Sequence, residues 1–458
     1  MRPSGEIRPT YAENFHCIGS SCEDTCCQGW NVPVDRESFE KYRNLPDVPL
    51  SALLKASVHP TPVSEGKEVT PANFAQIRMN EANQCPLLAT DGLCQVQREL
   101  GESMLSHTCS VYPRIINTVD GVQEKALSLS CPEAARLVLL HPNLLSLHRQ
   151  GAAATDTDLR LGTSDPAEVI AAQEALMQKR IDHPFTPQAW FWPIRAAIID
   201  LVGNRTYPLW QRLFLLGVFC RRLDAIAKGE LARPIPDFLG DFASTVATGN
   251  LLPAMDSLPV DRPAQLDVVL RLAGMMLHRS NVRPRFVECI QAFTDGIGNG
   301  PRATLETLSA QYAVAHDRHY QPFFERHPHI LENYLLNTIF RTHFPFGRSG
   351  AQANGIPDMT REFALLTAQF ALMKGLLIGV AGHHRYSFST NHVVLTFQAA
   401  AKHFEHHPEF LNQAHTLLVE SGMDGARGLA ILLRNTEPAS ATRPTVPTVQ
   451  VPMPQAGR

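Results

Sequence analysis

The cysteines of this chain are the residues whose type and spacing could carry chemistry. Eight of the ten lie between residues 17 and 131, with the spacing Cys17-x4-Cys22-x3-Cys26-Cys27 and then Cys85-x8-Cys94-x14-Cys109-x21-Cys131. Thiolates are soft donors that select zinc, copper(I) or iron–sulfur clusters, and a tetrahedral zinc or a cubane cluster takes four of them. Eight cysteines therefore predict two such sites, or one site with additional redox or structural thiols.

The adjacent cysteines Cys26 and Cys27 carry extra information. Neighbouring side chains diverge in any regular backbone, by about 100° per residue in a helix and to opposite faces in a strand. We therefore expect that the two do not both bind one ion. One points at the metal, and the other serves a second site or packs inward. His16 and His107 lie near this set in the sequence and are further possible ligands, although a lone histidine is more often a surface or hydrogen-bonding residue.

The cysteine motif of radical S-adenosylmethionine enzymes is present here except for its third cysteine. Enzymes that cleave S-adenosylmethionine by electron transfer usually hold their cluster with a C-x3-C-x2-C run. Here Cys22-x3-Cys26 would need a third cysteine at position 29, where the chain has Gly29. This departure argues against radical chemistry of that type, but not against an iron–sulfur cluster.

The elements that must position the eight cysteines are short and irregular. We interpret residues 1–150 as a small cysteine-rich metal-binding domain. Helices are predicted at 34–45, where Asp35 is a capping residue, at 94–104 and at 131–140, and residues 69–79 favour one or two short strands. A domain organised around metal does not need a large core of its own.

The rest of the chain has helical periodicity, so the predicted fold class is mainly α. Residues 151–166 favour turns and are predicted to be a linker or exposed loop. Residues 167–435 predict a multi-helix domain of about ten helices. Residues 436–458 are Pro-rich and are predicted to be a disordered tail. Cys220 and Cys289 lie in helical sequence, and we interpret them as small buried hydrophobes.

The composition is that of an ordinary soluble globular protein, with 44% apolar residues, 19% charged residues and a formal charge of −3. No basic face indicates nucleic acid, and the first residues contain no apolar run. The stretch at 213–219 is too short to cross a bilayer, and the one at 371–381 carries Lys374. We therefore expect a cytoplasmic protein that binds neither nucleic acid nor membrane. In that reducing compartment a metal site is the favoured role for clustered cysteines, and structural disulfides are the lesser alternative.

The cysteine pattern resembles that of the bacterial flagellin lysine N-methylases. Their amino-terminal part is related to small zinc/iron-chelating cysteine domains, which carry a close run ending in Cys-Cys and then three further short motifs. Here the run is "CIGSSCEDTCCQGW" (17–30), with its first cysteines spaced one residue wider. The three motifs are Cys85-Pro86-Leu87, Gly92-Leu93-Cys94, and Cys109 followed by Tyr112-Pro113. The stretch "ENYLLNTIFRTHFPFG" (332–347) also resembles a helical segment in the carboxy-terminal half of the methylases.

This resemblance implies an S-adenosylmethionine-dependent protein-lysine N-methyltransferase whose partner and substrate is flagellin. It also implies an iron–sulfur cluster, expected to be [4Fe-4S] with zinc as the alternative. The predicted metal-binding residues are the eight cysteines of the amino-terminal domain: Cys17, Cys22, Cys26, Cys27, Cys85, Cys94, Cys109 and Cys131. No G-x-G-x-x-G motif is evident after a strand, so the methyl donor would bind in an architecture other than a Rossmann fold.

Methyl transfer needs a neutral amine, because a lysine ammonium has no lone pair and its reference pKa is about 10.4. The sequence does not identify the base or the donor site. Polar candidates near the cysteines, each more often solvated or structural, are Glu23, Asp24, Tyr42 and Tyr112. Aromatic faces that could hold a sulfonium or methylammonium, but more often pack helices, are Trp30, Tyr334 and Phe346. His403 and His407 stand at i, i+4, a spacing that can bind metal on one helix face, within a histidine set more often solvated.

Two other functions stay open at this point. One is a non-catalytic zinc- or iron-binding scaffold whose helical domain binds a partner. The other is a redox protein that uses the cluster or the vicinal Cys26–Cys27 pair.

Overall fold

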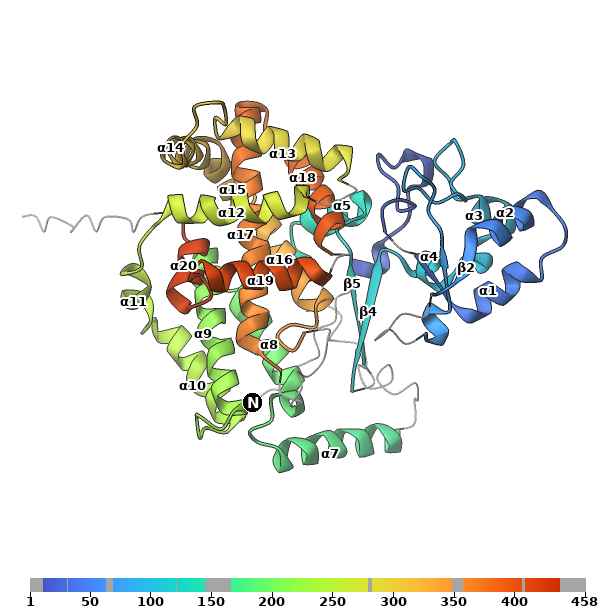
Figure 1. Cartoon of the computed structure of the whole chain (residues 1–458). Helices are drawn as coiled ribbons and strands as arrows, with labels where there is room; N and C mark the ends of the chain where they lie inside the picture. The colour runs from blue at the N-terminus through green and yellow to red at the C-terminus, as the bar shows by residue number, and fades with distance from the viewer. Residues whose placement is uncertain are drawn as a thin grey trace, which may run out of the picture.

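The computed structural model has a cysteine-bearing amino-terminal part beside a larger helical part (Figure 1). It describes residues 11–30, 32–62, 69–120, 122–144, 166–278, 282–347, 357–405 and 408–436. The predicted fold class, mainly α, is confirmed. The predicted tail beyond residue 436 and the predicted linker lie outside the described residues, except that Pro166 begins a helix.

The amino-terminal part consists of short elements. These are η1 (Tyr11–Asn14), η2 (Gly19–Ser21), β1 (Val32–Val34), α1 (Arg36–Arg43), α2 (Pro49–Ser57), β2 (Val58–Pro60), η3 (Pro71–Asn73), β3 (Ala75–Ile77), α3 (Gln95–Leu100), η4 (Glu102–Met104), α4 (His107–Val111), β4 (Arg114–Val119), β5 (Val122–Leu127) and α5 (Pro132–Leu139). The first three strands form a small antiparallel sheet in the order β1-β3-β2, and β4 pairs with β5 in a hairpin.

Local signals explain several of these elements. The Asp35 side chain accepts a hydrogen bond from Ser38 N at 2.9 Å and caps α1, as predicted. The helix predicted at 94–104 is divided into α3 and η4, because Gly101 stands between them with φ 87°, outside the helical region. A small core of side chains such as Val34, Leu54 and Val58 lies beneath the three-stranded sheet.

The helical part contains the long elements. They are α7 (Pro166–Asp182), η6 (Pro187–Trp190), α8 (Phe191–Val202), α9 (Leu209–Ala227), α10 (Ile235–Thr248), α11 (Leu252–Asp256), α12 (Arg262–Leu277), α13 (Pro284–Gly296), α14 (Leu305–Ala315), the π-helical turn η7 (His316–Tyr320), α15 (Gln321–Arg326), α16 (His329–Arg341), α17 (Met359–His384), η8 (Arg385–Ser387), α18 (Thr390–Phe404), α19 (Pro408–Glu420) and α20 (Ala426–Leu433).

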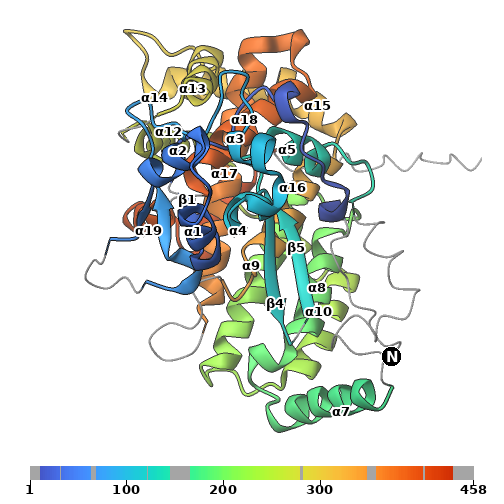
Figure 2. The same cartoon turned by 90° about the vertical axis from the view of Figure 1, so that its right-hand side faces the viewer.

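Helix α17 is the centre of this part, and α9, α12, α13, α18, α19 and α20 pack around it (Figures 1 and 2). Together with η8 it is the one helical stretch among the described residues that is long and apolar enough to cross a membrane, but its most apolar window is entirely buried inside the protein. Small residues let α13 approach closely, since a Cβ at Gly296 would overlap the Gly379 carbonyl oxygen. The burial is that of a core helix.

Helix α16 joins the two parts. The buried Asn337 side chain accepts from Tyr11 Oη at 2.6 Å and pairs with both backbone groups of Leu127, at 3.1 and 2.8 Å. Asn333 Nδ2 donates to the carbonyl oxygen of Val138 at 2.9 Å. Residues 11–15 and 126–144 therefore contribute to the large core of the helical part, whereas residues 32–109 form the small core. The segment 332–347, which resembles a methylase segment in sequence, therefore contains the helix that binds the amino-terminal part to the helical part.

Candidate metal centre

All eight predicted cysteine ligands lie on loops or at helix amino termini, outside strand interiors. Cys94 and Cys131 are the N-cap residues of α3 and α5. Cys109 lies in the first turn of α4, where its backbone N–H is capped by Ser106 Oγ at 3.4 Å. Unpaired N–H groups at helix amino termini favour negative charge, so these backbones suit thiolates.

Four of the thiols gather at the edge of the small core, and we call them the inner quartet: Cys27, Cys85, Cys94 and Cys109. Cys85 N donates to Cys27 O at 2.8 Å, and the Cys85 thiol is an electrostatic neighbour of Cys27. Cys94 is an electrostatic neighbour of both Cys27 and Cys109. Cys85 is buried and the other three are partly buried.

The remaining four thiols lie toward the helical part, and we call them the outer quartet: Cys17, Cys22, Cys26 and Cys131. Cys131 has Cys22 and Cys26 as electrostatic neighbours, and Cys22 has Cys17. Cys131 packs against the large core. The Sγ atoms of Cys26 and Cys27 are 4.0 Å apart. The adjacent pair therefore lies where the two quartets meet, an arrangement that agrees with its members serving different groups.

The protonated form of several thiols is favoured in the absence of a cation. Burial raises the pKa of Cys109 and of Cys131 to about 12. The hydrogen bond with Cys27 and then burial raise the pKa of Cys26 further. Since a metal ligand must be a thiolate, each of these thiols needs a positive charge beside it before it releases its proton. A bound metal would supply that charge.

Donor type and grouping fit a thiolate-bound metal, with four cysteines in each of two groups and all ten cysteines free of disulfides. As they stand, however, no three His, Cys, Asp or Glu side chains of the described residues are close enough together to hold an ion. Metal binding at these eight residues therefore stays a prediction, and it requires the thiols to draw together around the metal.

Gly29 has a structural reason to be glycine. Its φ is 80°, in the region that favours glycine, and a Cβ there would overlap the guanidinium of Arg283, the N-cap residue of α13. Arg283 Nη1 in turn donates to Gln28 Oε1 at 3.2 Å. A cysteine at position 29 would have to adopt this strained backbone conformation and displace the Arg283 guanidinium, so the fold disfavours the third cysteine of the radical-enzyme motif.

A buried polar network ties the cysteine run to α18. Lys402 Nζ donates to Asp24 Oδ2 at 2.5 Å and to Thr25 O at 2.8 Å, and Gln398 Nε2 donates to the same carboxylate oxygen at 2.6 Å. Burial by itself would raise the pKa of Asp24, but Lys402 and the hydrogen bonds lower it below its usual range. Lys402 is not among the residues predicted from the sequence, although a lysine in the apolar run "VVLTFQAAAKHF" (393–404) is a usable signal for a buried partner.

The predicted polar candidates are all engaged structurally. Glu23 pairs with Arg136, and Asp24 with Lys402. Tyr42 Oη donates to Met104 O at 2.8 Å, and Tyr112 Oη is 3.0 Å from Ser130 Oγ. Burial raises the pKa of both tyrosines.

The aromatic and histidine candidates lie apart from one another. Trp30 stacks on Tyr112 with ring centroids 5.8 Å apart and donates to Cys26 O, so it supports the cysteine loop. Tyr334 packs on Phe397 and Phe346 on Phe191, both inside the large core. His403 is buried against Phe286, and its predicted partner at 407 lies outside the described residues. Cys220 and Cys289 are buried, as predicted.

Comparison with known proteins identifies the family. A family model described as the FliB lysine N-methylase C-terminal domain matches residues 195–432. The chain belongs to the FliB lysine N-methylase family. Lysine-N-methylases of Salmonella choleraesuis and Salmonella typhimurium are each 24% identical to it over 417 residues, which is 88% of this chain and 93% of theirs. The flagellar biosynthetic protein FliU of Salmonella muenchen is 31% identical over 148 residues, 32% of this chain and 84% of FliU.

No solved structure matches the chain. Membership of the lysine N-methylase family supports an enzyme that transfers methyl groups to lysine, in agreement with the resemblance seen in the sequence.

Proposed function

We propose that the protein transfers methyl groups from S-adenosylmethionine to lysine side chains of flagellin in the cytoplasm, and that its cysteines hold an iron–sulfur cluster. The observation that carries the proposal is the relation to lysine-N-methylases over 88% of the chain, which takes in residues of both parts. The name of a third relative refers to flagellar biosynthesis, which supports flagellin as the substrate.

The reaction is a displacement that needs no redox step. The lone pair of a neutral lysine Nζ attacks the sulfonium methyl carbon in line with the carbon–sulfur bond. That bond breaks, sulfur keeps its electron pair as the thioether of S-adenosylhomocysteine, and the methylated nitrogen loses its proton to a base or to solvent. The protein's part is to hold the amine and the methyl group in line and to favour the uncharged amine by removing it from water.

The cysteine quartets support the cofactor part of the proposal. Each quartet offers four soft donors, the number that a [4Fe-4S] cluster takes. When bound, such a cluster would cross-link loops that lie between residues 17 and 131 and fix them against α5 and α18. Zinc is the alternative with the same donors.

Methylation of flagellin tests the proposal directly. The full chain, purified without oxygen, is incubated with S-adenosylmethionine and the flagellin of the same organism, and the flagellin is weighed by mass spectrometry. We expect added mass in steps of one CH2 unit, located on lysines. Flagellin of unchanged mass with a folded, metal-loaded protein would refute the methyltransferase.

Metal analysis of the same preparation tests the cluster separately. Iron with acid-labile sulfide and a brown colour supports the cluster. Stoichiometric zinc without iron would show that the cysteines bind zinc instead of an iron–sulfur cluster. An oxygen-free preparation that contains neither metal would refute the proposed cofactor.

A further inference from the structure

A charged cavity opens where the cysteine run meets the helical part. Its volume is about 370 Å³, and it lies between α5, α13 and α18, which come together at the boundary of the two parts (Figure 1). The charged lining residues are Glu23, Arg136, Arg285 and Glu288, and the others are Asn391, Val394 and Leu395. Ligand sites are frequently found at such boundaries between parts of a chain.

The two arginines are fixed in place by protein contacts. Arg285 Nη1 donates to Glu23 O at 3.2 Å, and Arg285 Nε donates to Gln398 Oε1 at 3.2 Å. Arg136 pairs with Glu23 and with Glu133. A guanidinium has five N–H donors, and the contacts of Arg285 to Glu23 O and Gln398 Oε1 use two of them, so other N–H groups can receive a carboxylate.

Glu288 provides the opposite charge. It makes no hydrogen bond or ion pair within the part of the chain that the structure describes, and its carboxylate is exposed at the cavity. An ammonium group is its natural partner. A purely anionic ligand would face two carboxylates, and a purely cationic ligand would face two guanidiniums. An α-amino acid carries both charges, so its carboxylate can pair with a guanidinium of the lining and its ammonium with a carboxylate.

The cavity lies directly beside the outer quartet. Glu23 follows Cys22 in the chain and is its electrostatic neighbour, and Arg136 lies on α5, whose N-cap residue is Cys131. We propose that this cavity binds the zwitterionic amino-acid end of the methyl donor, with its α-carboxylate on Arg285, its α-ammonium on Glu288 and its methylene chain against Val394 and Leu395. The inference rests on the proposed function, because it takes the donor to be S-adenosylmethionine.

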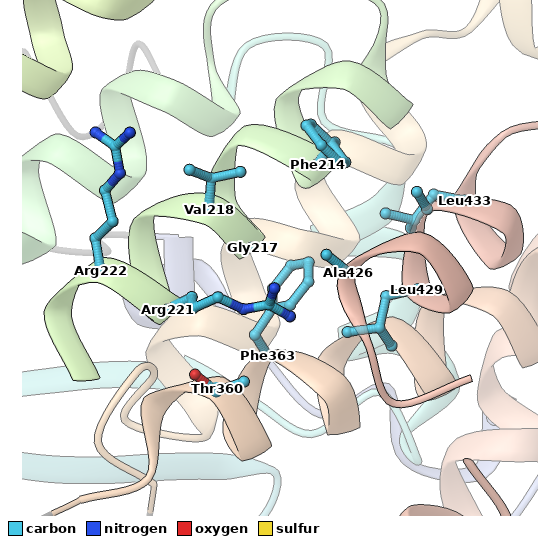
Figure 3. A pocket seen from close by; sticks show the side chains of 11 residues that line it. Phe214, Gly217, Val218, Arg221, Arg222, Thr360, Phe363, Ala426, Leu429 and Leu433 are labelled. Carbon is cyan, nitrogen blue, oxygen red and sulfur yellow. The ribbon is translucent and has the colours of Figure 1, made fainter. Parts of the chain in front are cut away.

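Two other cavities, on the far side of the helical part, are alternative binding sites for the methyl donor. An apolar cavity of about 210 Å³ lies between α9, α17 and α20, and its lining includes Phe214, Phe363, Leu429 and Arg221 (Figure 3). It shares Arg221 and Thr360 with a charged cavity of about 340 Å³. Helices α9 and α20 lie on the side of the helical part away from the cysteines (Figure 1). If the methyl donor bound there, replacing Arg221 would weaken its binding and replacing Arg285 would not.

Calorimetric binding of two probes to the full chain, purified without oxygen, tests the proposal. S-adenosylhomocysteine carries the amino-acid end, whereas 5′-methylthioadenosine keeps the nucleoside and thioether but lacks it. We expect Arg285→Gln and Glu288→Gln each to weaken S-adenosylhomocysteine binding by about ten-fold or more, and to leave 5′-methylthioadenosine binding unchanged. Arg221→Gln is the matched control and should change neither.

The possible results distinguish a wrong binding site from a wrong methyl donor. Unchanged S-adenosylhomocysteine binding in both cavity variants would overturn the proposal, and so would its loss in Arg221→Gln. Equal loss of both probes would also overturn it, because the residues would then act on the fold rather than on the amino-acid end. If the wild-type chain binds neither probe, the choice of S-adenosylmethionine as donor fails, and the cavity assignment fails with it. Replacing Arg285 could also weaken the contact between the cysteine run and the helical part. Glu288→Gln is free of this effect, because Glu288 is exposed and makes no hydrogen bond or ion pair among the described residues.

Discussion

The contact between Lys402 and Asp24 should control whether the cysteine run stays docked on α18. The side chains are 7% and 9% exposed, and their N–O distance is 2.5 Å. Lys402→Met removes this ion pair and the hydrogen bond to Thr25 O, and it leaves the Asp24 carboxylate buried with Gln398 as its remaining long-range partner. Breaking one side of a buried pair costs about 3–5 kcal/mol, and we use the lower value because Gln398 stays in place.

Hydrogen exchange of the cysteine run is the suitable assay, because it reports local opening and does not require the whole chain to unfold in one step. A loss of about 3 kcal/mol corresponds to exchange faster by roughly a hundred-fold or more. We expect this acceleration at the amides of Thr25 and Cys27, which are bonded to the Asp24 and Thr25 side chains, while α17 is unaffected. Lys41→Met is the matched control, because its pair with Glu37 is exposed and contributes little.

The double variant sharpens this test. Asp24→Asn combined with Lys402→Met removes both charges, so it should exchange more slowly than Lys402→Met alone. Exchange in Lys402→Met that equals the Lys41→Met control would refute the reasoning, and so would a double variant that opens by the sum of the two single effects.

Three further predictions concern metal, packing and pH. Cys26→Ser should lose metal and loosen the amino-terminal part, whereas Cys220→Ser should keep the wild-type metal content; metal loss in the second variant would contradict the ligand assignment. Gly379→Val should lower the melting temperature through a cost of about 1–3 kcal/mol, because its Cβ would overlap the Phe293 ring of α13, and an unchanged melting temperature would show that the helices can separate. Burial raises the pKa of Glu362 from its ordinary value of 4.5 to about 7. The folded state therefore holds this proton more tightly between pH 4.5 and 7, and stability falls as the pH rises through that window. Glu362→Gln should melt at a higher temperature than wild type at pH 8 and show little difference at pH 4, and equal melting at both pH values would contradict this.

Local sequence patterns predicted much of the fold. The capping residue Asp35 of α1 and Pro132 at the start of α5 each act within a few residues, so the sequence reveals these helix starts directly. The β4–β5 hairpin was missed, although Asp120-Gly121 between its strands is a recognisable turn signal.

The contacts around the cysteines were harder to foresee. Asp24 and Lys402 are 378 positions apart, and no periodicity relates two residues at that separation. Gly29 could be recognised as a departure from a motif, but its reason, the guanidinium of Arg283 against a backbone at positive φ, needs the packed helix. The division of the eight cysteines into two quartets likewise depends on how four separate segments fold together.

The most direct test of lysine methylation is the transfer of a labelled methyl group. Wild-type protein purified without oxygen is given flagellin and S-adenosylmethionine whose methyl group carries deuterium, and the flagellin peptides are sequenced by mass spectrometry. We expect deuterated methyl groups on lysine Nζ atoms, and none when Cys26→Ser protein replaces the wild type. Flagellin lysines without label, in the presence of folded protein with its full metal content, would contradict it.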